Sequence, residues 1–115
     1  MKSKQEMKLV SQIIQELSLF VMYHGYKTFD ISCRRDDFEE SFTLVLPNRH
    51  NDMLSFLEKK INQKREYEIE AYYSELLGDL DSSTELNILG LVIDYMTIKD
   101  DDDKTIITLT RLIKT

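Results

Sequence analysis

The chain is poor in the residues that usually interrupt or cross-link a fold. Its 115 residues include one proline, three glycines, one cysteine and no tryptophan. Such a composition supplies no flexible linker, and the length fits a single domain over residues 1–115. One cysteine, Cys33, excludes an internal disulfide and is typical of a reducing compartment, so we expect a cytoplasmic protein.

Long apolar runs and basic patches are missing as well. No run approaches the ~20 apolar residues that cross a bilayer, and the charged first residues continue into a helical pattern, unlike a signal peptide. We therefore expect no membrane partner. The net charge of −6 is opposite to the basic footprint that neutralises phosphates, which argues against a nucleic-acid partner. It favours encounter with a basic surface on another protein.

Residues for metal or thiol chemistry are few and badly spaced. His24, His50 and the cysteine lack the close-spaced pairs of zinc sites, so we interpret the histidines as cap and loop residues. Cys33 shares its strand phase with apolar neighbours, which predicts a buried, inert thiol. The run Asp100–Asp103 lacks the ligand spacing and mid-loop glycine of an EF-hand and is interpreted as a solvated turn. We expect no metal site.

The first helical pattern has a signal at each end. Ser3 and Glu6 have capping-box spacing, and Gly25 is placed for a left-handed C-terminal cap. Between them, apolar residues repeat at intervals of three and four, as on the buried side of a helix. This stripe consists of Leu9, Val10, Ile13, Ile14, Leu17, Phe20 and Val21.

Helical patterns return in the middle of the chain. One runs from Asn51 to about Leu77 and stops at a glycine; its charged middle is either a turn between two helices or part of one exposed helix. Ser82 and Glu85 then form a second capping-box signature, which opens a helix that continues to about residue 93.

Alternating apolar and polar residues predict two hairpins. The first joins a strand at Phe29–Cys33 to one at Phe42–Leu46, where Pro47 ends the ladder. The second joins Tyr95–Lys99 to Thr105–Ile113. The expected order is α-β-β-α-α-α-β-β. It predicts an α/β (α+β) two-layer sandwich, with a mostly antiparallel sheet and the helices on one face.

Two segments resemble motifs of the GHKL (Bergerat-fold) ATPase superfamily. Residues 16–25, Glu-Leu-Ser-Leu-Phe-Val-Met-Tyr-His-Gly, resemble the Glu-Leu-x-x-Asn-Ala-x-x-His-Gly pattern of anti-sigma-factor kinases, which are related to histidine-kinase ATPase domains. Residues 86–93 resemble the family's second glycine box, roughly Gly-x-Gly-Leu-Gly-Leu, and a hairpin follows as in the family. The resemblance spans most of the chain and implies a GHKL-like fold.

The nucleotide-binding positions implied by the resemblance hold unsuitable residues. Phe20 stands where the family holds Mg²⁺ with an asparagine, and a benzyl group offers no oxygen ligand. Residues 46–50 replace the adenine-recognising Asp-x-Gly-x-Gly turn and contain neither aspartate nor glycine. Leu86 and Ile88 stand where glycines would let backbone N–H groups close on phosphate.

Three residues remain as vestigial candidates. Glu16 matches the position of the family's general base, while Gly90 and Thr105 are the candidates for a vestigial cofactor site. A base without a metal, a nucleotide pocket or a phosphate cradle has nothing to act on. A solvent-facing or hydrogen-bonded role in the helix is the alternative for Glu16. We therefore expect no cofactor and no enzyme activity.

One helical segment carries a positive signal for binding a partner. Tyr67, Glu68, Tyr72 and Glu75 lie where the pattern exposes tyrosines among carboxylates. Tyrosine supplies contact area at low entropy cost and is enriched at protein interfaces. A solvated acidic helix face is the alternative interpretation of the same residues.

These observations support three hypotheses. The first is a non-catalytic protein-binding or regulatory module, similar to an anti-sigma factor, on a degenerate ATPase-like scaffold. The second is a divergent ATP-binding, anti-sigma-type serine kinase that keeps Glu16 and rebuilds the pocket from other residues. The third is a self-associating structural protein whose tyrosine-bearing helix forms a homodimer face.

Overall fold

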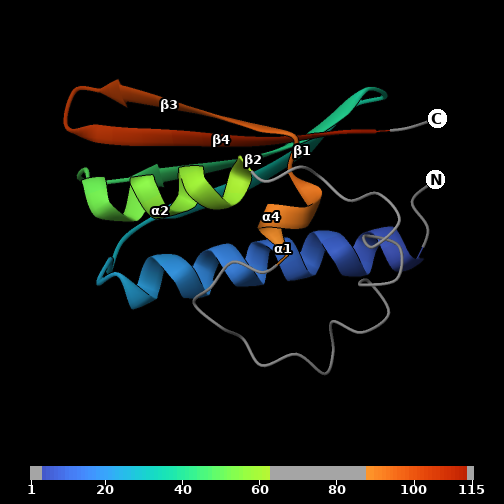
Figure 1. Ribbon diagram of the computed structural model, residues 1–115, viewed down its shortest axis with the longest axis horizontal. Helices are drawn as coiled ribbons and strands as arrows, with labels where there is room; N and C mark the ends of the chain where they lie inside the picture. Colours follow the sequence, from blue (N-terminus) through green and yellow to red (C-terminus); the bar gives the residue numbers. More distant parts are fainter. Residues whose placement is uncertain (1–3, 63–87, 114–115) are drawn as a thin grey trace.

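The structure, a computed structural model, describes residues 4–62 and 88–113. Its elements are helix α1 (Lys4–Tyr23), strands β1 (Asp30–Arg35) and β2 (Glu39–Leu46), helices α2 (Asn51–Ile61) and α4 (Leu89–Val92), and strands β3 (Tyr95–Asp101) and β4 (Lys104–Leu112). The strands form one antiparallel sheet in the order β1-β2-β4-β3. Figure 1 shows the helices together on one side of this sheet, so the fold is α+β.

One face of the sheet forms the core with the helices. In β2 every second residue is buried, and its Phe42 and Leu44 lie opposite Leu109 and Ile107 of β4. These side chains pack against the apolar stripe of α1, which includes the fully buried Ile13, Leu17 and Phe20. The period-two and period-3.6 patterns therefore predicted the buried faces of these elements correctly.

Gly25 ends α1 as the sequence predicts. Its φ is +92°, its N–H donates to the carbonyl of Met22 at 3.0 Å, and the N–H of Tyr26 donates to Val21 at 3.3 Å. This pair of bonds is the Schellman motif. Apart from the two chain neighbours of Gly25, no heavy atom of the described residues lies within 4 Å of the place a Cβ would take, so the backbone conformation is what requires glycine here.

Cys33 corrects one prediction. Its strand phase is as expected, because it lies opposite the buried Phe42 in the β1–β2 ladder. Strand β1, however, is at the edge of the sheet, and the Cys33 side chain is exposed. Phase decides which face a side chain takes, but burial also needs a second layer above it. The prediction of a buried core thiol is wrong.

The second hairpin is close to the prediction and slightly longer. Strand β3 continues through Asp101, and the turn consists of Asp102 and Asp103. Asp102 has a φ of +56°, a conformation that aspartate tolerates better than most residues. Ser82, Glu85 and the helical pattern beyond residue 62 lie outside the described residues. None of the described helices combines the length and apolar character needed to cross a bilayer.

Candidate functional site

Glu16 is bonded to the beginning of α4. Its Oε1 accepts hydrogen bonds from the backbone N–H groups of Ile88 at 2.9 Å and Leu89 at 3.0 Å, and its Oε2 lies 3.2 Å from the Ile88 nitrogen. The residue is only 8 % exposed. A helix leaves its first N–H groups without intrahelical partners. The carboxylate of Glu16 satisfies such donors from a distant part of the chain.

The surroundings of Glu16 act on its charge in opposite directions. Burial raises the pKa of this carboxyl group above 4.5, whereas the N–H donors of Leu89 and Ile88 and the positive charge of Lys60 lower it. A raised pKa suits a group that takes up a proton. Both oxygens nevertheless accept hydrogen bonds from the backbone of α4, so the carboxylate is already held in a structural contact.

This contact joins the two segments that carry the resemblance. Glu16 opens the first segment, and Ile88 and Leu89 belong to the second. In a glycine box, backbone N–H groups at this place close on phosphate. Here the N–H groups of Ile88 and Leu89 are directed at a side chain of the protein itself. Gly90 follows directly and is buried in α4.

Phe20 is used for core packing. Its side chain is fully buried. The ring meets His24 edge-on with 4.6 Å between ring centroids, and it stacks on Phe56 at 5.8 Å. The position that would hold a metal-binding asparagine in the resembled motif thus joins α1 to α2 through aromatic contacts.

The two histidines lie next to each other, with ring centroids 5.5 Å apart. His50 is the N-cap of α2, and its Nδ1 accepts a hydrogen bond from the Met53 N–H at 3.1 Å. In that neutral tautomer the proton is on Nε2, which leaves His50 no lone pair for a metal ion. Burial lowers the pKa of His24, and repulsion from the His50 ring, when that ring is protonated, lowers it further. Among residues 4–62 and 88–113, no group of three or more His, Cys, Asp or Glu could hold a metal.

An open pocket of about 450 Å³ lies beside the histidines and the turn after β2. It is lined by His24, Gly25, Tyr26, Lys27, Pro47 and His50, among others. The Tyr26 hydroxyl donates to the carbonyl of Asn48 at 2.8 Å. The pocket therefore lies at the end of the first resembled segment, next to residues 47–50 after β2.

Thr105 makes its polar contacts in a different part of the fold from Glu16. Its hydroxyl donates to Oδ1 of Asp100 at 3.1 Å, and Oδ2 of Asp100 pairs with Arg49 at 2.6 Å. The hydroxyl is thus part of the polar contacts at the end of the second hairpin. Of the three vestigial candidates, Glu16 and Gly90 are brought close through α4, and Thr105 serves a different cluster.

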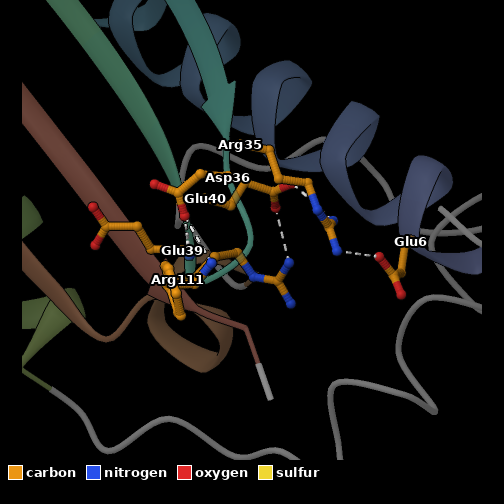
Figure 2. A network of polar contacts seen from close by, with 7 residues as sticks. Glu6, Arg35, Asp36, Glu39, Glu40 and Arg111 are labelled. Carbon is orange, nitrogen blue, oxygen red and sulfur yellow. Dashed lines mark hydrogen bonds and ion pairs between the residues drawn. The ribbon is translucent and has the colours of Figure 1, made fainter. Parts of the chain in front are cut away.

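Figure 2 shows a network of ion pairs that sequence reasoning missed. Arg35, Glu40 and Arg111 lie side by side on adjacent strands. Glu40, whose side chain is 0 % exposed, pairs with Arg111 at 2.9 Å and with Arg35 at 3.2 Å. Arg35 also pairs with Glu6 of α1 at 2.8 Å. The network ties three strands to the N-terminal part of α1.

A signal for this network is present in the sequence. Glu40 precedes Phe42 by two positions, and Arg111 follows Leu109 by two. Each charged residue therefore lies on the same strand face as the apolar residues of its strand. A charged residue in that phase faces the core side, where it needs a partner of opposite charge. The two phases together indicate a buried pair once β2 and β4 are known to be neighbours.

The predicted partner-binding residues Tyr67, Glu68, Tyr72 and Glu75 lie outside the described residues.

Comparison of the chain with family models, with curated proteins and with solved structures finds no match in any of the three.

Proposed function

We propose that the chain is a non-catalytic protein-binding or regulatory module on a degenerate GHKL-like scaffold, which acts by docking a protein partner. The contact between Glu16 and the backbone of Ile88 and Leu89 carries this proposal. A phosphate group bound at these N–H groups would have to displace a carboxylate that is bonded there at 2.9–3.0 Å. It would also be repelled by the charge of that carboxylate.

Phe20 supports the same proposal. A cation bound between α1 and a nucleotide needs oxygen ligands, and the fully buried Phe20 ring fills the matching position with core contacts. The chain keeps the helix and the two hairpins implied by the resemblance and uses the matching positions for its own packing. Such a scaffold retains surfaces for a partner without a reaction to perform.

Isothermal titration of the full chain with ATP and Mg²⁺ tests the absence of a nucleotide site. We expect no binding at concentrations up to about 1 mM, which corresponds to less than roughly 4 kcal/mol of binding free energy. Binding in the micromolar range would reverse the proposal. A matched titration of Glu16→Gln shows whether the carboxylate is what excludes phosphate, because that variant keeps an acceptor and loses the charge.

The second candidate is a divergent ATP-binding serine kinase, and the pocket beside His24 and His50 is the observation that favours it. With about 450 Å³, it falls in the size range of small-molecule sites. The candidate predicts transfer of phosphate to a protein serine, which incubation with labelled ATP and the captured partner detects. An unlabelled partner that stays bound favours the non-catalytic module.

A further inference from the structure

Strand β3 presents an open backbone edge. It is the last strand of the sheet, and in the described ranges only β4 pairs with it. The hairpin closes on the pair Asp101–Lys104, with a turn between them. In a hairpin with a two-residue turn, the two closing residues exchange both of their backbone hydrogen bonds. Along the ladder, hydrogen-bonded pairs then alternate with pairs that are not hydrogen-bonded. The N–H and C=O groups of Met96, Ile98 and Asp100 are therefore directed away from β4.

A groove of about 300 Å³ runs beside this edge, between β3 and the C-terminal part of α2. Glu58 and Ile61 of α2 and its C-cap Asn62 line one side, and Met96 and Ile98 line the other from β3. Met96 and Ile98 lie opposite the buried Leu109 and Ile107. Their side chains consequently face the helix layer. The same two residues offer apolar side chains to the groove and free backbone groups to the edge.

The groove has acidic walls. Its lining contains the carboxylates of Glu58 and Asp94, and no lysine or arginine from the described residues. Lys99 pairs with Ile106 in the ladder and so belongs to the other face of the sheet. A segment lying in the groove therefore meets negative charge beside an apolar floor.

We propose that an extended, basic segment of a protein partner adds to β3 as a further strand. Its alternate aliphatic side chains pack on Ile61, Met96 and Ile98, and its lysine or arginine side chains lie beside Glu58. Strand addition supplies affinity through main-chain hydrogen bonds and specificity through alternate side chains. The inference rests on the proposed protein-binding function and adds to it the site and the chemistry of the partner.

Charge favours such a partner over a second copy of this chain. Pairing of two β3 edges would bring two acidic grooves and two chains of net charge −6 together. Like charges placed opposite each other across an interface oppose association. A basic segment has the complementary charge and gains from the same carboxylates.

The first test uses a capped peptide, Lys-Val-Lys-Val-Lys-Val, titrated into the isotope-labelled full chain and followed by NMR. We expect the amide signals of Met96 and Ile98 to shift and their hydrogen exchange to slow, because both N–H groups gain acceptors. The peptide with glutamate in place of lysine should not bind. Absence of binding by the lysine peptide up to about 1 mM, or binding that leaves these amides unchanged, overturns the proposal.

Backbone N-methylation of the peptide distinguishes strand addition from simple charge attraction. Two further peptides carry N-methyl groups on every second residue. The first is methylated at the odd-numbered positions and the second at the even-numbered positions. Only one phase of an added strand directs its N–H groups at β3, so one methylated peptide should lose binding and the other should keep it. Equal binding of both peptides overturns the added strand. This test leaves the protein unaltered.

Variants of the protein test the acidic wall. Glu58→Lys should weaken the lysine peptide about tenfold, as expected for reversal of a nearby charge. Asp37→Lys makes the same change in net charge in the β1–β2 turn, which is exposed like Glu58, and should leave affinity unchanged. Equal weakening by both variants overturns the groove as the site. Thermal unfolding of each variant establishes that it is folded.

Failure of this site can be told apart from failure of the proposed function. A partner captured from cells whose affinity is unaffected by Glu58→Lys overturns the groove and leaves the binding module standing. Micromolar binding of ATP overturns the function whatever the peptides do. A concentration-dependent mass increase of the chain alone, with protection of Met96 and Ile98, identifies a second copy as the occupant and overturns the basic partner.

Discussion

The carboxylate of Glu16 accepts a hydrogen bond at 2.9 Å from the backbone of Ile88, which lies 72 positions further along the chain. This bond links the middle of α1 to the helical turn that precedes the second hairpin. Figure 1 shows α4 next to α1, on the helix side of the sheet. A buried charge is costly unless donors satisfy it, and here the donors are backbone groups of a short helix that need an acceptor. The two requirements are met by one contact.

Replacement of Glu16 by alanine should lower the free energy of unfolding by about 1–3 kcal/mol, because it leaves the N–H groups of Ile88 and Leu89 without their acceptor. Glu16→Gln keeps a carbonyl oxygen at the same place and should lose less. Urea unfolding at neutral pH measures both variants. An alanine variant as stable as the wild type would show that these bonds contribute nothing.

The same residue predicts a pH dependence of stability. Burial raises the pKa of Glu16 in the folded protein above its ordinary value of 4.5. The folded state then binds the proton more tightly than the unfolded state, so stability from this group is greatest below pH 4.5 and is lost as the pH rises through the raised pKa. The unfolding free energy of the wild type minus that of Glu16→Gln should therefore fall as the pH rises through that window. A difference that grows with pH would contradict the raised pKa.

Glu40 lies between two arginines, and its removal should be costly. Glu40→Gln keeps the shape but leaves Arg111, 9 % exposed, and Arg35 without their common carboxylate. Loss of one partner of a buried ion pair costs about 3–5 kcal/mol.

Glu39→Gln is the matched control, since Glu39 is adjacent, faces the other side of β2 and is only half-buried. It should stay within about 0.5 kcal/mol of the wild type. Equal effects in chemical denaturation would show that the network is not what stabilises this end of the sheet.

Gly25 allows a test of backbone conformation without a steric effect. At a φ of +92°, an alanine is strained, and Gly25→Ala should destabilise the protein by about 1–2 kcal/mol. Gly25→Asn should be tolerated better, since asparagine also occurs at this cap position. Thermal unfolding of the two variants gives the order. An alanine variant more stable than the asparagine variant would mean that α1 ends differently in solution.

The features that the sequence predicted are those decided by neighbouring residues. The stripe from Leu9 to Val21, the cap at Gly25 and the alternation in both hairpins depend on local periodicity, and the structure has the corresponding elements. The four-stranded antiparallel sheet follows from those hairpins once they are placed side by side. Local patterns therefore sufficed for the helices and strands that the structure describes.

The misses all depend on which elements become neighbours. Cys33 has the phase of a core residue, but only the strand order β1-β2-β4-β3 places it at an edge. Glu40 and Arg111 become partners because β2 and β4 are adjacent, although they are 71 positions apart. A hydrogen-bonded role for Glu16 was one of the expected alternatives, and only its partner in α4, a long-range contact, was not predicted. Strand phase and helix period carry no information on these pairings.

His24 should titrate below the ordinary histidine value. A charged imidazole at a helix C-terminus is favoured by the helix dipole, but burial lowers the pKa of His24 below 6.5, and repulsion from the His50 ring, when that ring is protonated, lowers it further. The unfolded chain then binds the proton more tightly, so stability is lost as the pH falls below 6.5 toward the lowered pKa. NMR titration of the imidazole gives this pKa directly, and His24→Gln should remove the corresponding part of the acid destabilisation. A pKa at or above 6.5 would mean that the dipole outweighs burial and the neighbouring ring.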